Sequence, residues 1–200
     1  MISYSDDQLI YRGLLNHISS DSPEILEALK RLSKSFDIHR YKEGDVLWDW
    51  GTMESKLCFV LSGVAIEYIK TNRYHHILRM YRSGKFMFPE DPFLYSAPSE
   101  TYCKMQVPGK VACITVKQMN ALVENGAIDS LLIASLLELS MTEYRQSTYE
   151  LLQTSGVNRI NAALEQFPDL LDVLPRDDVA AYLGISRASL FRSLKQREKK

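Results

Sequence analysis

The chain has 200 residues, of which 46% are hydrophobic and 24% are charged, and its net charge at pH 7 is −1. This composition is ordinary for a soluble globular protein, and the length allows two small domains. No eighteen apolar residues run together, and the first residues lack a basic stretch followed by an apolar one. We therefore expect neither a membrane-spanning helix nor secretion.

The first predicted elements are two short amphipathic helices. Over residues 5–18, Ser5 is placed to cap a helix whose apolar side chains lie on one side. In the second, Ser22 is the expected cap, Pro23 suits the first helical position and Glu24 suits the positive end of the helix. Both helices are expected to be packing elements.

From Phe36 the hydrophobic pattern changes from helical to alternating, and turn residues such as Gly44, Gly63 and Pro108-Gly109 divide the segment. The predicted strands cover residues 36–41, 46–50, 57–61, 65–69, 75–81, 86–88, 102–107 and 111–116. Eight short antiparallel strands are typical of a jelly roll. The predicted fold class is therefore α+β, with an N-terminal β jelly roll, flanking helices, a long helix and a C-terminal pair of helices.

Three cysteines, Cys58, Cys103 and Cys113, lie in apolar strand-like runs without a Cys-x-x-Cys spacing. This pattern favours buried thiols in a reducing, cytoplasmic compartment over a disulfide framework. The same spacing argues against a zinc or iron–sulfur cofactor bound by cysteines.

The run from Tyr41 to Tyr68 is similar to the first half of a cyclic-nucleotide-binding domain, with glycines at Gly44, Gly51 and Gly63. The resemblance implies a sensor built on the jelly roll. The fold alone does not identify a ligand, because jelly rolls host many functions.

A long helical stretch is predicted over residues 117–152, with a break near Asn125-Gly126. Its second part carries a seam with spacings of four, three, four and three residues, which favours a parallel homodimer. The seam residues are Leu137, Met141, Tyr144, Thr148 and Leu151. Ser155-Gly156 then interrupts the helix, and we interpret this point as a hinge.

Residues 176–195 have the pattern of a helix-turn-helix. Asp177 and Asp178 suit a helix N-terminus, Gly184 ends the first helix, and Ser186 is a good cap for the second. The last 25 residues carry seven basic and three acidic side chains, a net charge of +4, which leaves −5 for residues 1–175. Only this end of the chain therefore suits a polyanionic partner.

Counted through Gly184, this segment resembles the C-terminal helix-turn-helix of the Crp/Fnr family of bacterial transcription regulators. The resemblance implies a dimer that reads a pseudo-palindromic operator in double-stranded DNA, with RNA polymerase as a further partner. The residues that it assigns to DNA are Ser186, Arg187, Ser189, Arg192 and Lys195. The expected parts are a sensor domain at 1–126, a dimerisation helix at 127–154 and a DNA-binding domain at 155–200.

The effector pocket implied by the resemblance departs from that of cyclic-AMP-binding members. Glu90 matches the carboxylate that holds the ribose, but Glu100 stands where an Arg would hold the cyclic phosphate. Tyr144 and Arg145 occupy the positions where the long helix would offer a hydroxyl. Because a carboxylate repels a phosphate, we expect no response to cyclic AMP, and an effector of another kind stays open.

Two alternatives to this non-enzymatic function are retained. The first is a cupin-like jelly-roll enzyme with a metal, for which the only His pair is the adjacent His75-His76. The second is a regulatory module whose C-terminal helices bind another protein rather than DNA.

Overall fold

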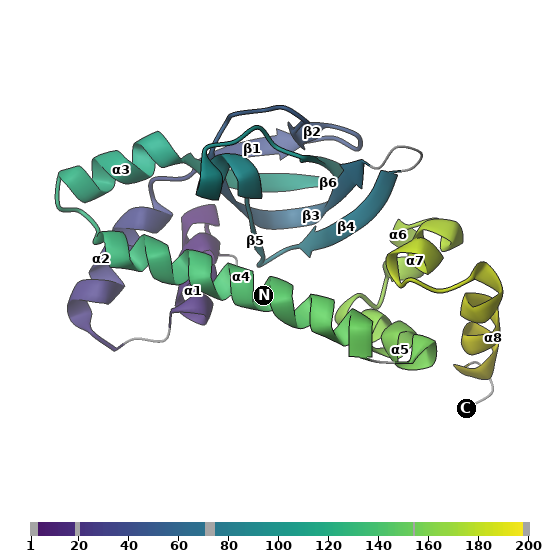
Figure 1. Cartoon of the computed structure of the whole chain (residues 1–200). Helices are drawn as coiled ribbons and strands as arrows, with labels where there is room; N and C mark the ends of the chain where they lie inside the picture. Colours follow the sequence, from purple (N-terminus) through teal and green to yellow (C-terminus); the bar gives the residue numbers. More distant parts are fainter. Residues whose placement is uncertain (1–3, 19–20, 71–74, 154, 198–200) are drawn as a thin grey trace.

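The computed structural model describes residues 4–18, 21–70, 75–153 and 155–197. It is an α+β structure, as the sequence predicts, in which helices lie below an antiparallel sheet and at its two ends (Figure 1). The strands are β1 (Asp37–Tyr41), β2 (Val46–Trp48), β3 (Lys56–Lys70), β4 (His75–Arg82), β5 (Phe86–Met87) and β6 (Thr101–Thr115). The helices are α1 (Asp6–His17), α2 (Pro23–Ser33), the π-helical turn η1 (Asp91–Tyr95), α3 (Val116–Glu124), α4 (Ser130–Gln153), α5 (Gly156–Gln166), α6 (Leu170–Val173), α7 (Arg176–Tyr182) and α8 (Arg187–Arg197).

The two long strands β3 and β6 pair along most of their length and contribute to both halves of the sheet. One half has the order β1–β6–β3–β5, and the other has the order β2–β6–β3–β4. All pairs are antiparallel. Buried residues of both halves belong to one cluster that includes Trp48, Val60, Tyr81 and Met105, so the halves enclose a common interior.

The prediction of eight separate strands is wrong at two points, because β3 continues through Gly63 and β6 continues through Pro108-Gly109. The register of the β3–β6 pair shifts around Ser62 and Val64, which shows that the strands bend there instead of ending. Gly63 has a φ of +86°, and a side chain on Gly109 would collide with the backbone of Ser62. These glycines allow the backbones of β3 and β6 to approach closely where the strands bend. The hydrophobic pattern of the neighbouring residues does not distinguish this role of a glycine from a turn.

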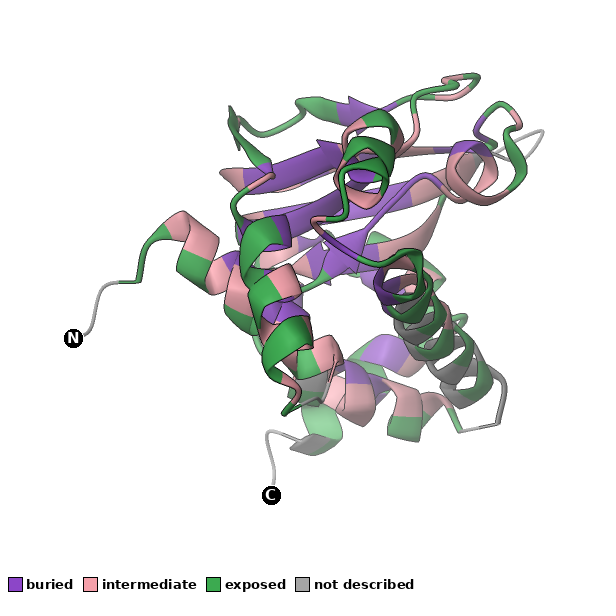
Figure 2. Cartoon of the chain, turned by 90° about the vertical axis from the view of Figure 1, so that its left-hand side faces the viewer, coloured by how far each residue is buried: buried purple, intermediate pink, exposed green. Residues whose placement is uncertain are grey.

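Three hydrophobic clusters lie on successive faces of the strands. Alternate β3 residues Leu57 and Phe59 face a cluster shared with α1, α2 and α4, whereas Cys58 and Val60 face the interior between the halves. Ile66 of the second half faces a third cluster, which it shares with the C-terminal helices. The buried strands can be followed in Figure 2, with the exposed sides of the helices outermost.

Helix α4 runs beneath the sheet from the α1–α2 pair toward α5 (Figure 1). The predicted break before α4 is confirmed, since α3 ends at Glu124 and Gly126 has a φ of +72°. Leu132 and Leu136 of α4 are buried against the first cluster. Among the described residues, no helix is long and apolar enough to cross a membrane.

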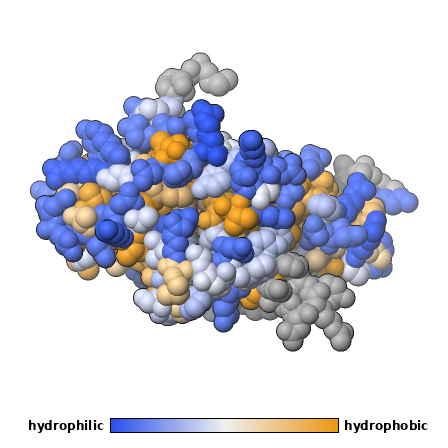
Figure 3. Space-filling model, turned by 90° about the horizontal axis from the view of Figure 1, so that it is seen from above, coloured by the Kyte–Doolittle hydropathy of each residue, from blue (hydrophilic) through white to orange (hydrophobic). Residues whose placement is uncertain are grey.

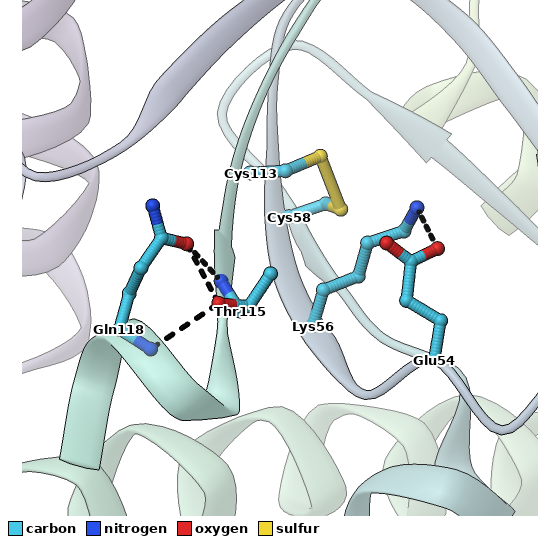
Figure 4. Close-up of a disulfide and its surroundings, with 6 residues drawn as sticks. All are labelled: Glu54, Lys56, Cys58, Cys113, Thr115 and Gln118. Carbon is cyan, nitrogen blue, oxygen red and sulfur yellow. Dashed lines mark hydrogen bonds and ion pairs between the residues drawn. A yellow bond between two sulfur atoms is a disulfide. The ribbon is translucent and has the colours of Figure 1, made fainter.

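The prediction of three free thiols is wrong for two cysteines, because Cys58 and Cys113 form a disulfide (Figure 4). The two residues are direct partners in the antiparallel β3–β6 pair, with their Cα atoms 4.1 Å apart. A separation of 55 residues hides this pairing from the sequence. Cys103 is a buried free thiol, and burial raises its pKa well above its ordinary value.

The same close-up shows how β6 passes into α3. Thr115 caps the helix by accepting from the N–H of Gln118 at 3.2 Å, and the Gln118 side chain accepts from the N–H of Thr115 at 2.8 Å (Figure 4). This reciprocal pair is a capping box, and it fixes the point at which the strand turns into the helix.

Candidate functional site

The C-terminal helices α7 and α8 are joined by a short turn at Gly184, which has a φ of +59°. Leu183 and Leu190 are buried at 1% and 0% exposure, and Ala180 lies in the same cluster. Ser186 accepts a hydrogen bond from the N–H of Ser189 at 3.1 Å, as expected for a helix cap. The sequence thus located both helices and their turn, although it missed the four-residue helix α6.

Four of the five residues that the sequence assigned to DNA lie on α8, and the fifth, Ser186, precedes the helix as its cap. Arg187, Arg192 and Lys195 are exposed, while the hydroxyls of Ser186 and Ser189 lie 2.9 Å apart. The Arg192 guanidinium donates to the Ser189 hydroxyl at 3.3 Å. The three basic side chains are therefore exposed on α8, whereas Ser189 is half-buried and Ser186 lies just before the helix.

One acidic side chain faces this basic surface. Arg187 forms an ion pair with Asp177 of α7 at 2.9 Å, with both side chains more than 60% exposed. Exposed pairs of this kind contribute about 0–1 kcal/mol. Arg187 and Arg176 also lie over the ring of Phe191, at 5.5 and 5.2 Å from its centre.

The C-terminal helices are docked on the outer face of β3 and β4. Val64, Ile66 and Met80 share a buried cluster with residues of α5 to α8. At the edge of this cluster, the Arg82 guanidinium lies 2.8 Å from the Asp169 carboxylate, and the Gln106 amide donates to the Val173 carbonyl at 3.4 Å. These contacts set the position of α7 and α8 relative to the sheet.

The interior of the sheet contains a polar network that sequence reasoning missed. The Glu67 side chain is buried at 0% exposure and accepts from the Tyr81 hydroxyl at 2.7 Å and the Thr101 hydroxyl at 2.8 Å. Arg79 lies 3.7 Å from Glu67 and 2.9 Å from Glu90. The available signal was Glu67 itself, a single carboxylate at an inward position of the apolar run Val64–Ile69.

Burial dominates the electrostatics of this network. It raises the pKa of Glu67 above its ordinary value of 4.5, against the opposing effects of the Arg79 charge and the two hydrogen bonds. Burial and the neighbouring Glu67 also raise the pKa of Tyr81 well above 10. The network places one cation between two carboxylates in the interior of the sheet, and the buried Nε of Arg79 has no hydrogen-bond partner among the described residues.

Of the three residues assigned to an effector pocket whose side chains the structure describes, Glu90 lies beside this network and the other two are exposed. Glu90 contacts the network through Arg79, but Glu100 is exposed, and its backbone N–H donates to Asp91 at 2.9 Å. Arg145 is exposed on α4, and the side chain of Tyr144 lies outside the described part of the chain.

The predicted dimer seam is described only in its first part. Leu137 and Met141 are partly buried against the chain's own first cluster. The side chains of Tyr144, Thr148 and Leu151 lie outside the described residues. Their role in a dimer stays a prediction.

The metal site of the cupin-like alternative would need several ligands. Within the described ranges, no group of three His, Cys, Asp or Glu side chains is placed to hold a metal ion. His76 is exposed on β4, and the side chain of His75 is not among those described.

No model of a known protein family matches the sequence, and no curated protein matches it. Solved structures of Crp/Fnr-type regulators do match its fold. The c-di-GMP-responsive global regulator CLP of Xanthomonas campestris has a TM-score of 0.64 at 18% identity, covering 86% of this chain and 91% of that chain. A putative cAMP-binding regulatory protein from Silicibacter pomeroyi has a TM-score of 0.66 at 18% identity, covering 98% and 89%. The catabolite activator protein of Thermus thermophilus has a TM-score of 0.53 at 20% identity, covering 94% and 87%. At these identities the likeness shows a shared fold.

Proposed function

We propose that this protein is a DNA-binding transcription regulator of the Crp/Fnr type. The observation that carries the proposal is the outer face of α8, where Arg187, Arg192 and Lys195 are exposed together on a helix whose other side is buried. A recognition helix needs this arrangement, because cations bind phosphates and a planar guanidinium reads a guanine edge. The shared fold supports the proposal.

In the proposed complex, α7 and α8 act as a helix-turn-helix, with α8 in the major groove of double-stranded DNA. Arg187, Ser189 and Arg192 read bases, while Ser186 and Lys195 contact phosphates. The exposed Asp177 carboxylate that holds Arg187 at 2.9 Å is replaced by DNA at small cost, since such pairs are weak in water.

We also infer the division of labour along the chain. Residues 1–126 form the sensor, α4 within 127–154 provides the homodimer contact, and 155–200 bind DNA. Two α8 helices then enter successive major grooves about 34–36 Å apart on a pseudo-palindrome. A cytoplasmic location and a contact with RNA polymerase follow from this function.

A cyclic AMP response is not part of the proposal. Arg79, a cation of the interior, lies between Glu67 and Glu90, so a phosphate would have to compete with two carboxylates for it. The melting temperature with and without saturating cyclic AMP or cyclic GMP tests this point. A ligand at a hundred times its dissociation constant adds about 2.7 kcal/mol, so a clear rise would restore nucleotide sensing.

The DNA-binding proposal is tested by selecting binding sites from a random duplex pool with the full-length protein. Arg192→Ala is expected to weaken binding to the selected site by about 1–3 kcal/mol and to relax the preference at one base. Arg31→Ala, which removes an exposed arginine of α2, is the matched control. If no sequence is enriched, or if Arg192→Ala binds as tightly as the parent, the assignment of α8 is wrong.

A further inference from the structure

A cleft of about 730 Å³ lies between α8 and the α5–α6 segment. This volume falls within the roughly 300–1,000 Å³ of small-molecule sites. Leu164, Leu171 and Leu194 provide an apolar floor, and the exposed ring of Phe191 stands at the border. Figure 3 views the molecule from above, and at its right-hand end, which carries these helices, hydrophobic groups lie among hydrophilic ones.

The rim of the cleft is strongly basic. Arg176 of α7 and Arg192 and Lys195 of α8 line it, and all three are exposed. Among the described residues that line the cleft, none is acidic. The Arg176 guanidinium lies 5.2 Å from the centre of the Phe191 ring, which places this cation beside apolar surface. The cleft thus combines three positive charges with a hydrophobic floor.

We propose that this cleft binds an amphipathic organic carboxylate, with its acyl chain or ring on the leucines and its carboxylate among the three cations. The apolar part gains about 25 cal/mol for each Å² removed from water, and the head group gains charge-assisted hydrogen bonds. A DNA phosphate would satisfy the rim but leave the leucine floor in water. Charge and hydrophobicity together therefore specify a ligand that carries both features.

Binding at this cleft has a consequence for DNA. Arg192 and Lys195 belong to the face proposed to contact DNA, so a carboxylate that engages them competes with the duplex. This consequence rests on the proposed function, whereas the binding site itself does not. The effector of this regulator then acts on the DNA-binding helices directly, outside the interior of the sheet.

Calorimetric titration of the full-length protein with octanoate tests the site. Octan-1-ol, which has the chain without the charge, and acetate, which has the charge without the chain, are the controls. Octanoate is expected to bind saturably with one molecule per chain and at least tenfold more tightly than either control. If acetate binds as tightly as octanoate, the basic side chains bind any small anion. If octan-1-ol binds as tightly, the cleft is a nonspecific apolar surface. Either result, or the absence of saturable octanoate binding, would overturn the proposal.

The location is tested with Arg176→Gln, because Arg176 is exposed and lies outside the residues assigned to DNA. The loss of one exposed charge contact is expected to weaken octanoate binding roughly three- to fivefold. Arg31→Gln on α2 should leave it unchanged. Octanoate should shift the amide NMR signals of α8 and the α5–α6 segment. If the shifts fall in the sheet interior instead, the ligand binds elsewhere and the proposal is wrong.

The competition is measured with the DNA site selected above. Octanoate at ten times its wild-type dissociation constant should weaken DNA binding about tenfold if one chain binds and about a hundredfold if a homodimer with two sites binds, and by less in Arg176→Gln at the same concentration. Unchanged DNA affinity with octanoate bound would overturn the competition. A protein that binds octanoate but selects no DNA would refute the proposed function and leave the carboxylate site established by calorimetry.

Discussion

At the scale of single residues, Glu67 is the least ordinary side chain of the fold. Its carboxylate is fully buried, accepts from Tyr81 and Thr101, and lies 3.7 Å from Arg79. A buried ion pair is expensive to desolvate, and its value to stability depends on complete hydrogen bonding. The two hydroxyls and the guanidinium surround the Glu67 carboxylate, so the network joins facing positions of β3, β4 and β6, although the buried Nε of Arg79 has no hydrogen-bond partner in the described part of the chain.

The raised pKa of Glu67 predicts a specific dependence of stability on pH. Because the folded-state pKa lies above the ordinary 4.5, the folded state holds this proton to higher pH than the unfolded state does. The wild type therefore loses stability from this group as pH rises from about 4.5 through the folded-state pKa. Glu67→Gln has no such loss, so its free energy of unfolding relative to the wild type should increase over that range. Urea unfolding of both proteins at several pH values measures the difference.

Glu138→Gln on the exposed surface of α4 is the matched control for the loss of one negative charge. A constant difference between wild type and Glu67→Gln across this pH range would show that Glu67 is ionised in the folded protein as readily as in the unfolded one. The reasoning about burial would then be incorrect.

The Cys58–Cys113 disulfide predicts a response to reductant. A cross-link between residues 55 positions apart restricts the unfolded chain, which the chain-entropy model values at about 4 kcal/mol. Urea unfolding with and without a phosphine reductant should show a loss of this order. A Cys58→Ala/Cys113→Ala double variant should be insensitive to the reductant. If the wild type is equally insensitive, the cysteines are the free thiols that their sequence pattern indicates.

At the scale of elements, the turn between α7 and α8 depends on one backbone conformation. Gly184 has a φ of +59°, and a Cβ there would lie 3.2 Å from an Arg159 nitrogen. Gly184→Ala is expected to cost about 1–2 kcal/mol, because a residue with a Cβ is strained in this left-handed region. Hydrogen exchange should show faster exchange of α8 amides, while the β3 and β6 amides serve as an internal control. Unchanged protection of α8 would mean that the turn tolerates a side chain.

The helices were predictable from sequence because their signals are local. Ser5, Ser22 and Ser186 mark helix starts, and Gly126 and Gly184 mark ends, within a few residues of the observed boundaries. The strands were predictable as alternating segments, but their continuity was not. Gly63 and Gly109 show why. Whether a glycine starts a turn or allows two paired strands to approach closely depends on the partner strand.

At the scale of the whole molecule, the features that could not be predicted are those that depend on the register between distant strands. The exposed face of α8 was predictable, since helical spacing alone places Arg187 and Arg192 outside. The interior network required β3, β4 and β6 to pair so that Glu67 meets Arg79 and Thr101. The same strands present Ile66 and Met80 to the C-terminal helices on their other face. A short stretch of sequence can mark Glu67 as a carboxylate in an apolar run, but it does not show which strands supply the partners of Glu67 or of Ile66.

The separation of charge along the chain gives the last prediction. Residues 1–175 carry −5 and residues 176–200 carry +4, so the net charge favours DNA binding at the C-terminal end. Each phosphate contact releases counterions and adds about 0.9 to the slope of log affinity against log salt. If the protein binds as a homodimer, Lys195→Gln removes two contacts and should reduce this slope by about 1.8. A monomer should lose about 0.9, and a protein that binds DNA without Lys195 should lose nothing. Fluorescence anisotropy of a labelled selected site at several salt concentrations distinguishes these three outcomes. Lys56→Gln on β3 is the control for removing a lysine elsewhere. The Lys56 ammonium pairs with Glu54 at 2.9 Å.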